Sequence, residues 1–261
     1  PGETPAVPWT KALPQHFRDR YDSDILDHLP QLFFRVDGRA VSRVRWQYLD
    51  CLTYLFVDAF GRQIGEWCED NDMKHTGHLL AEQSLLSQAR AVGATLPFYE
   101  HMQAPGIDIL TEHRQELGTA KQCSSVLRQT GRRWMLSELY GCTGWDFPFE
   151  GHKAVGDWQA AMGVTVRCQH LSYYTMSGQA KRDYPASIHF QSPWWEHYST
   201  VEDYFARLGT VLSRGEAVRD LLVAALTSPA ALGRTHGEGE ADHPAHASCC
   251  SPGGAGSVLS N

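Results

Sequence analysis

Between residues 14 and 226, short apolar runs alternate with helical patterns, and this alternation constrains the fold more than any other feature. Strands are expected at residues 74–81, 95–101, 133–138 and 164–170, and helices at residues 84–92, 119–129, 149–162 and 200–214, with Thr200 as the N-cap of the last. Strands that recur about every 20–40 residues with helices between them are typical of a parallel α/β fold.

The flanking regions have different patterns. Residues 14–30 carry short helical patterns, and residues 31–36 form an apolar run that suits a strand or a helix end. Apolar side chains recur three and four positions apart over residues 41–60, which predicts a long amphipathic helix. No aromatic residue follows Phe205, and the composition after residue 226 cannot bury a core. We therefore expect a folded unit at residues 9–226 and a disordered low-complexity tail at residues 227–261.

Composition excludes several classes of protein. The net charge of −7 provides no basic surface for nucleic acid. No apolar run approaches the roughly 20 residues of a membrane-spanning helix, and the first residues show no secretory signal. The seven cysteines include no Cys-x-x-Cys pair, so we expect free thiols, the first five of them buried. The absence of a Gly-x-Gly-x-x-Gly or Walker loop argues against nucleotide binding.

Polar side chains stand at the end of each expected strand. In chain order these are His78 and Glu82; Tyr99, Glu100 and His101; Glu138 and Tyr140; and His170, Tyr173 and Tyr174. The carboxyl ends of the strands of a (β/α)8 barrel converge on one active site. This distribution is therefore the one expected of a barrel enzyme.

Paired carboxyl groups are the requirement for glycoside hydrolysis, one on each side of the scissile bond. Glu138 has the strongest local context, because small and aromatic residues (Tyr140, Trp145) follow it directly. Glu100 and Glu82 are the other candidates, although Glu82 suits the start of a helix equally well.

Aromatic and polar residues in the loops suggest how a sugar would be held. Tyr173, Trp194 and Trp195 follow the fourth strand, and their rings suit stacking on sugar faces, unless the two tryptophans only fill the rim of the barrel. Histidines are expected to bind hydroxyl groups or to form core hydrogen bonds. No His-Glu-x-x-His spacing occurs, so neither a metal nor a cofactor is expected.

Several segments resemble large bacterial glycoside hydrolases, the α-L-rhamnosidase-like and β-galactosidase-like multidomain enzymes. They are Trp9-Thr10, His16-Phe17, Tyr21-Asp22, Asp24-Ile25, Leu29-Pro30, residues 75–82, residues 99–108, residues 137–141, Gly144-Trp145 and His170. The resemblance covers roughly residues 9 to 223. It implies a (β/α)8 catalytic domain, with Glu138 at the end of the seventh strand as nucleophile or base. It also implies a carbohydrate substrate and sugar contacts from His78, His101, Asp108, Tyr140, Trp145, His170, Tyr173, Trp194 and Trp195.

The departures from this family are equally informative. Family members carry further barrel strands, and a strand end with a catalytic acid, before the segment that resembles residues 7–10, and they continue into accessory domains after residue 223. We therefore expect the C-terminal half of a barrel, with weak activity or none alone. The alternative is a non-catalytic carbohydrate-binding or scaffold protein derived from the same barrel. Neither a nucleic-acid nor a membrane partner is expected, and the localisation stays open between cytoplasmic and secreted.

Overall fold

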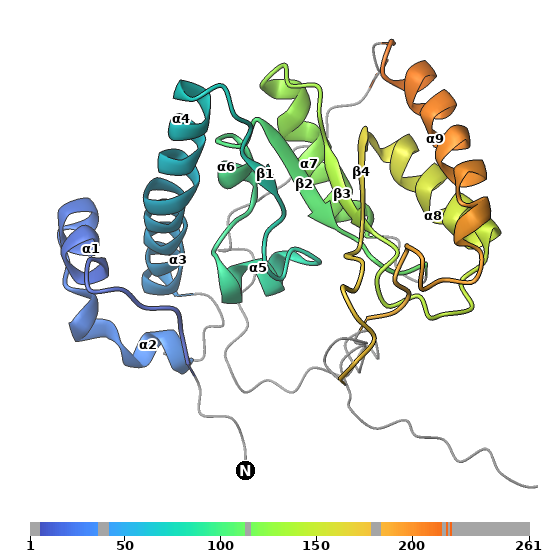
Figure 1. Cartoon of the computed structure of the whole chain (residues 1–261). Coiled ribbons are helices and arrows are strands. Elements are labelled where there is room, and N and C mark those ends of the chain that lie inside the picture. The colour runs from blue at the N-terminus through green and yellow to red at the C-terminus, as the bar shows by residue number, and fades with distance from the viewer. Residues whose placement is uncertain are drawn as a thin grey trace, which may run out of the picture.

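A four-stranded parallel sheet forms the centre of the protein, and its strands follow chain order as β1-β2-β3-β4 (Figure 1). The computed structural model describes residues 6–35, 42–112, 116–178, 184–215, 218 and 220. The strands are Thr76–Gly77 (β1), Ala104–Asp108 (β2), Leu136–Leu139 (β3) and Val166–Gln169 (β4). The expected parallel α/β class is confirmed. The expected domain boundary after residue 226 and the tail lie outside the described residues.

A helical region precedes the sheet. It comprises α1 (Leu13–Tyr21), a 3-10 turn (Ile25–His28), α2 (Pro30–Phe33), α3 (Arg43–Phe56), the π-helical turn η2 (Val57–Arg62) and α4 (Gln63–Asp70). The chain stays helical from α3 through η2 into α4, so the expected amphipathic helix extends ten residues further than its pattern indicated. The ambiguous run at residues 31–36 begins as the end of α2.

The remaining helices connect the strands and follow β4. They are α5 (Leu85–Ala91), α6 (Leu96–Tyr99), α7 (Leu117–Gln129), α8 (Phe149–Met162), the 3-10 turn η4 (Trp195–His197) and α9 (Ser199–Leu212). α7 packs on β2, and α8 packs between α7 and α9. Helix α9 begins at Ser199 without a side-chain cap, so the prediction of Thr200 as its N-cap is wrong.

The second strand differs from the expectation. Residues 95–101 form α6 and a turn, whereas the strand is Ala104–Asp108, where no strand was expected. Pro105 and Gly106 lower the strand propensity of this segment. Gly106 is nevertheless required by the sheet, because a Cβ at this position would lie 2.6 Å from the carbonyl oxygen of Gly77.

The two faces of the sheet differ in exposure. Ser137 and Leu139 of β3 are buried, whereas the alternating residues Leu136 and Glu138 are only half-buried. Beneath the buried face, a core of residues from α6, α7 and the strands includes Phe98, Ile107, Cys123 and Met135. The face that carries Glu138 is therefore the more accessible face of the sheet.

Two further expectations concern the burial of the cysteines and the lack of a helix that could span a membrane. Cys51, Cys68 and Cys123 are buried free thiols, as expected. Burial was wrongly predicted for two cysteines: Cys142 is half-buried in the turn after β3, and Cys168 is exposed within β4, the edge strand of the sheet. Across the described ranges, no helix has the length and apolar character needed to cross a membrane.

Candidate functional site

Glu138 lies at the carboxyl end of the central sheet, in register with Asp108 of β2 and Cys168 of β4. Neighbours in register on parallel strands project from the same face, so these three residues form a row across the sheet. The side chain of Glu138 is 29 % exposed and that of Asp108 is 30 % exposed. Both carboxylates are therefore accessible to solvent without being freely mobile.

His78, just after β1, stands between these two carboxylates. Its Nε2 lies 3.1 Å from Oε2 of Glu138, within hydrogen-bond distance. Its Nδ1 lies 3.8 Å from Oδ2 of Asp108, which is too long for a hydrogen bond. One imidazole therefore contacts Glu138 at the end of β3 and lies beside Asp108 at the end of β2.

His170, just after β4, approaches Glu138 from the other side. Its Nε2 lies 3.9 Å from Oε1 of Glu138, and its side chain is only 8 % exposed. Among the described residues, its Nδ1 has no hydrogen-bond partner. Gly141 allows this placement, because a Cβ there would lie 2.7 Å from the imidazole ring. We call His78, Asp108, Glu138 and His170 the carboxyl-edge cluster.

Glu82 lies beneath the carboxyl-edge cluster and supports it. It is 1 % exposed, and its carboxylate accepts hydrogen bonds from the Tyr99 hydroxyl, at 2.8 Å, and from the backbone N–H of Asp108. Burial raises the pKa of Glu82 to about 7. Glu82 therefore fixes the end of β2 from inside the core and has no surface to offer a substrate, contrary to its expected catalytic role.

Glu100 and His101 are not part of this cluster. Both lie in the turn between α6 and β2, so they precede the strand and lie toward its amino end. Glu100 is exposed there, and the backbone of His101 packs against Gly65 of α4. Their prediction as site residues was wrong because the strand begins after them.

Tyr140 and Trp194 belong to a second group, which we call the aromatic cluster. Its members surround the imidazole of His152 and come from the loop after β3, from α8 and from the segment before α9: Tyr140, Phe147, Phe149, His152, Trp194 and Tyr198. Tyr140 is completely buried and its hydroxyl donates to the carbonyl of His152 at 3.1 Å. Sugar contact by Tyr140 is thereby ruled out, and Trp194 is half-buried in the same packing.

The other aromatic candidates lie in loops that follow β3 and β4. The rings of Trp145 and Tyr173 are 6.1 Å apart, and Tyr173 is buried. Trp195 is 36 % exposed and stacks on Tyr198, at the border of the aromatic cluster. Trp145 therefore remains the first partly exposed aromatic side chain after Glu138 in the chain.

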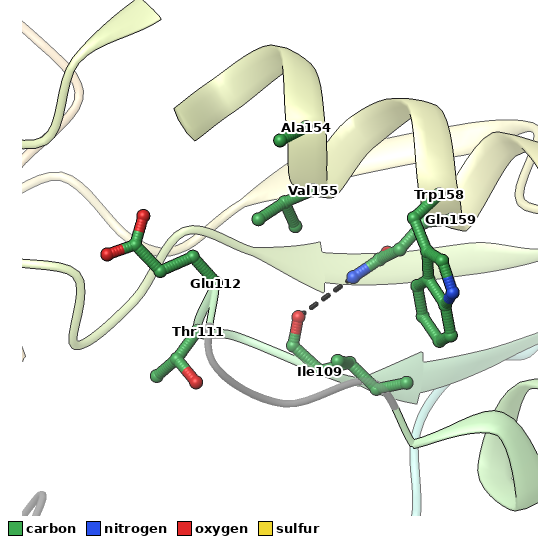
Figure 2. A pocket seen from close by; sticks show the side chains of 7 residues that line it. All are labelled: Ile109, Thr111, Glu112, Ala154, Val155, Trp158 and Gln159. Atoms are coloured by element: carbon green, nitrogen blue, oxygen red, sulfur yellow. Dashed lines mark hydrogen bonds between the residues drawn. The ribbon is translucent and has the colours of Figure 1, made fainter. Parts of the chain in front are cut away.

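A small pocket lies elsewhere, between the segment that follows β2 and helix α8 (Figure 2). Gln159 of α8 spans it and donates to the carbonyl oxygen of Ile109 at 2.9 Å. Val155 and Trp158 supply apolar walls. None of the residues expected at the site lines this pocket, so it is separate from the carboxyl-edge cluster.

Comparison with known proteins does not assign this chain to a family. The chain matches no model of a known protein family, and it matches no curated protein. What the fold defines is a mixed α/β protein with a parallel sheet and a cluster of histidines and carboxylates at its carboxyl edge.

The sequence identified all four members of the carboxyl-edge cluster, but not their direct contacts. They stand at positions 78, 108, 138 and 170, one per strand, so a nearly constant interval was available as an indication. Sequence reasoning missed Cys168, which faces the same side of the sheet as Glu138. The alternation of side chains along a strand would have revealed it had the bounds of β4 been known.

Proposed function

We propose that this chain is the catalytic portion of a glycoside hydrolase, with Glu138 as nucleophile or general base. The observation that carries the proposal is the position of Glu138 at the carboxyl edge of a parallel sheet, accessible and hydrogen-bonded to His78. Enzymes built on parallel barrels place their catalytic groups at this edge.

We further propose that the four strands are half of a (β/α)8 barrel, the second half if the family resemblance holds. Parallel strands in unbroken chain order, with helices between them, suit this architecture. The half-buried face that carries Leu136 and Glu138 suits the interior of such a barrel, which further strands would cover.

We assign Asp108 as the second carboxyl group of the site, in place of Glu82 and Glu100. Glu82 is buried and Glu100 lies toward the amino end of β2, whereas an oxygen of Asp108 lies within 4.8 Å of an oxygen of Glu138. Retaining glycosidases need carboxyl groups about 5 Å apart. In this mechanism one carboxylate oxygen bonds to the anomeric carbon as the bond to the leaving oxygen breaks, and the partner carboxylic acid supplies the proton to that oxygen.

A non-catalytic carbohydrate-binding protein is the second candidate, and one feature favours it. Asp108 and Glu138 occupy neighbouring strands with His78 between them, rather than opposite walls of a cleft. In that case Glu138, His78 and Trp145 would hold a sugar without cleaving it.

Aryl glycosides distinguish the two candidates. The assay uses this chain and, where one exists, a longer natural polypeptide that contains it, each compared with Glu138→Gln. Turnover that disappears in the Glu138→Gln variant supports the hydrolase. Saturable sugar binding without turnover in either form supports the binding protein. Turnover that is unaffected by Glu138→Gln contradicts the proposed role of Glu138.

A further inference from the structure

We infer that the carboxyl-edge cluster is a binding site for a divalent transition-metal ion, with Zn²⁺ as the best-suited ion. Taking one ligand atom from each of His78, Asp108 and Glu138, the three atoms lie within 4.8 Å of one another. Imidazole nitrogen and carboxylate oxygen are two of the ligand types that zinc binds. This inference does not depend on the proposed glycosidase activity.

The distances within the cluster suit a shared ion. Ligand atoms about 2.1 Å from a metal lie roughly 3.0–3.4 Å apart in octahedral or tetrahedral geometry. The contact between Nε2 of His78 and Oε2 of Glu138 is 3.1 Å, which matches two ligands of one ion. Asp108 is nearest to the other ring nitrogen of His78, and its ligand oxygen lies within 4.8 Å of the other two ligand atoms, so an inward movement of Asp108 would complete a set of three protein ligands.

His170 is the second, independent observation. Its side chain is more than nine-tenths buried, its Nδ1 lacks a hydrogen-bond partner among the described residues, and its Nε2 faces Oε1 of Glu138 at 3.9 Å. A buried imidazole with so few partners is costly, and ligation to a metal through Nε2, the nitrogen that faces Glu138, would give it a strong one. His170 can therefore serve as the fourth ligand, or leave that position open to water.

The ligand chemistry also selects the ion. Calcium and magnesium prefer sites built from oxygen, whereas imidazole favours zinc and its transition-metal neighbours. Two carboxylates with one or two neutral imidazoles balance the charge of a divalent ion. The side chains of His78, Asp108 and Glu138 are about one-third exposed, which leaves a path for the ion.

Occupation by zinc has a consequence for Glu138. The ion binds the carboxylate oxygens that an attack on an anomeric carbon would use, so a metal-loaded Glu138 is not free to act as a nucleophile. Metal binding and glycoside turnover are therefore separate properties of one cluster, and each needs its own measurement.

The test is calorimetric titration of the full chain with Zn²⁺, in a background that carries Cys249→Ser and Cys250→Ser so that these adjacent thiols cannot bind the ion. We expect one zinc ion to bind per chain and the melting temperature to rise with zinc concentration. His78→Gln and Glu138→Gln should each weaken binding at least about 100-fold. The matched controls are His197→Gln and Glu150→Gln, which change exposed residues elsewhere and should leave the affinity unchanged.

Cobalt supplies a readout of the ligands themselves. Co²⁺ in the site should give visible d–d absorption without a thiolate charge-transfer band, and His78→Gln should abolish it. Circular dichroism confirms that each variant is folded before it is titrated. Equal zinc affinity in the parent chain and in folded His78→Gln and Glu138→Gln would overturn the inference, as would the absence of zinc binding or a spectrum dominated by thiolate.

Discussion

The aromatic cluster and the carboxyl-edge cluster use histidine in opposite ways. His152 of the aromatic cluster is completely buried, with five aromatic ring centroids between 4.4 and 6.0 Å from its own. Burial lowers its pKa, and its Nδ1 contacts the Pro148 carbonyl at 2.9 Å. His78, by contrast, is partly exposed between two carboxylates. The surroundings of a histidine therefore indicate its role better than its presence near a strand end.

The same contrast separates the aromatic residues. Tyr140 follows Glu138 by two positions, yet its ring points into the helical layer and packs on His152. Its backbone has a φ of 70°, in the left-handed region, which directs the chain away from the line of β3. Glu138 and Tyr140, which lie at the end of the same strand, thus belong to different clusters.

Glu138→Gln should have the largest effect, a loss of at least about a thousand-fold in glycoside turnover by the active form of the protein. The amide keeps the shape of the side chain and removes its charge. Steady-state kinetics with aryl glycosides measures the change. Glu100→Gln is the matched comparison, and we expect it to leave turnover unchanged because Glu100 lies toward the other edge of the sheet. The reverse ranking of the two variants would move the site to that edge.

Glu82 should make the stability of the site region depend on pH. Its folded pKa of about 7 exceeds the ordinary value of 4.5, so the folded protein binds this proton more tightly than the unfolded chain. Stability should therefore fall as pH rises from about 4.5 to about 7 and then level off, by roughly 3 kcal/mol in total.

Urea denaturation across this pH range measures the dependence on Glu82. The Glu82→Gln variant should lose that part of the slope, since an amide does not titrate. An identical slope in the variant and the parent protein would show that Glu82 is ionised throughout the range.

Tyr140→Phe should have a smaller effect, confined to stability. The substitution removes a hydroxyl that donates to the His152 carbonyl at 3.1 Å and accepts from the Arg167 guanidinium at 3.3 Å. We expect a loss of about 1–2 kcal/mol in the free energy of unfolding and unchanged zinc affinity. A weakened zinc or sugar affinity with unchanged stability would instead place Tyr140 in the functional site.

The alternation of strands and helices was predicted well from the sequence, and the bounds of the strands less well. Helix α8 was predicted at its observed bounds because the glycine that follows it, Gly163, is a strong local signal for the end of a helix, and this residue has a φ of 116°. β2 was displaced by several residues, because Pro105 and Gly106 are tolerated only through contacts with the neighbouring strands. Local propensity does not contain such contacts.

The candidate site was predictable in its members but not in its grouping. Glu138, His78 and His170 could be named because they are polar residues at the ends of expected strands, whereas Asp108 was named through the family resemblance. Whether Glu82 is buried or Glu138 is exposed depends on which way a turn places its side chains, and that is decided by tertiary packing. The sequence did not indicate the proposed metal site, because its ligands come from successive strands. Sequence motifs detect ligands that lie within one element.

We propose the carboxyl-edge cluster, and not the aromatic cluster, as the functional site of this protein. Histidine-ring NMR of the isotopically labelled protein tests it directly, with His78, His170 and His152 followed in one sample as Zn²⁺ and then a panel of glycosides are added. We expect perturbed resonances for His78 and His170 and an unchanged resonance for His152. A response at His152 with silent His78 and His170 would contradict it.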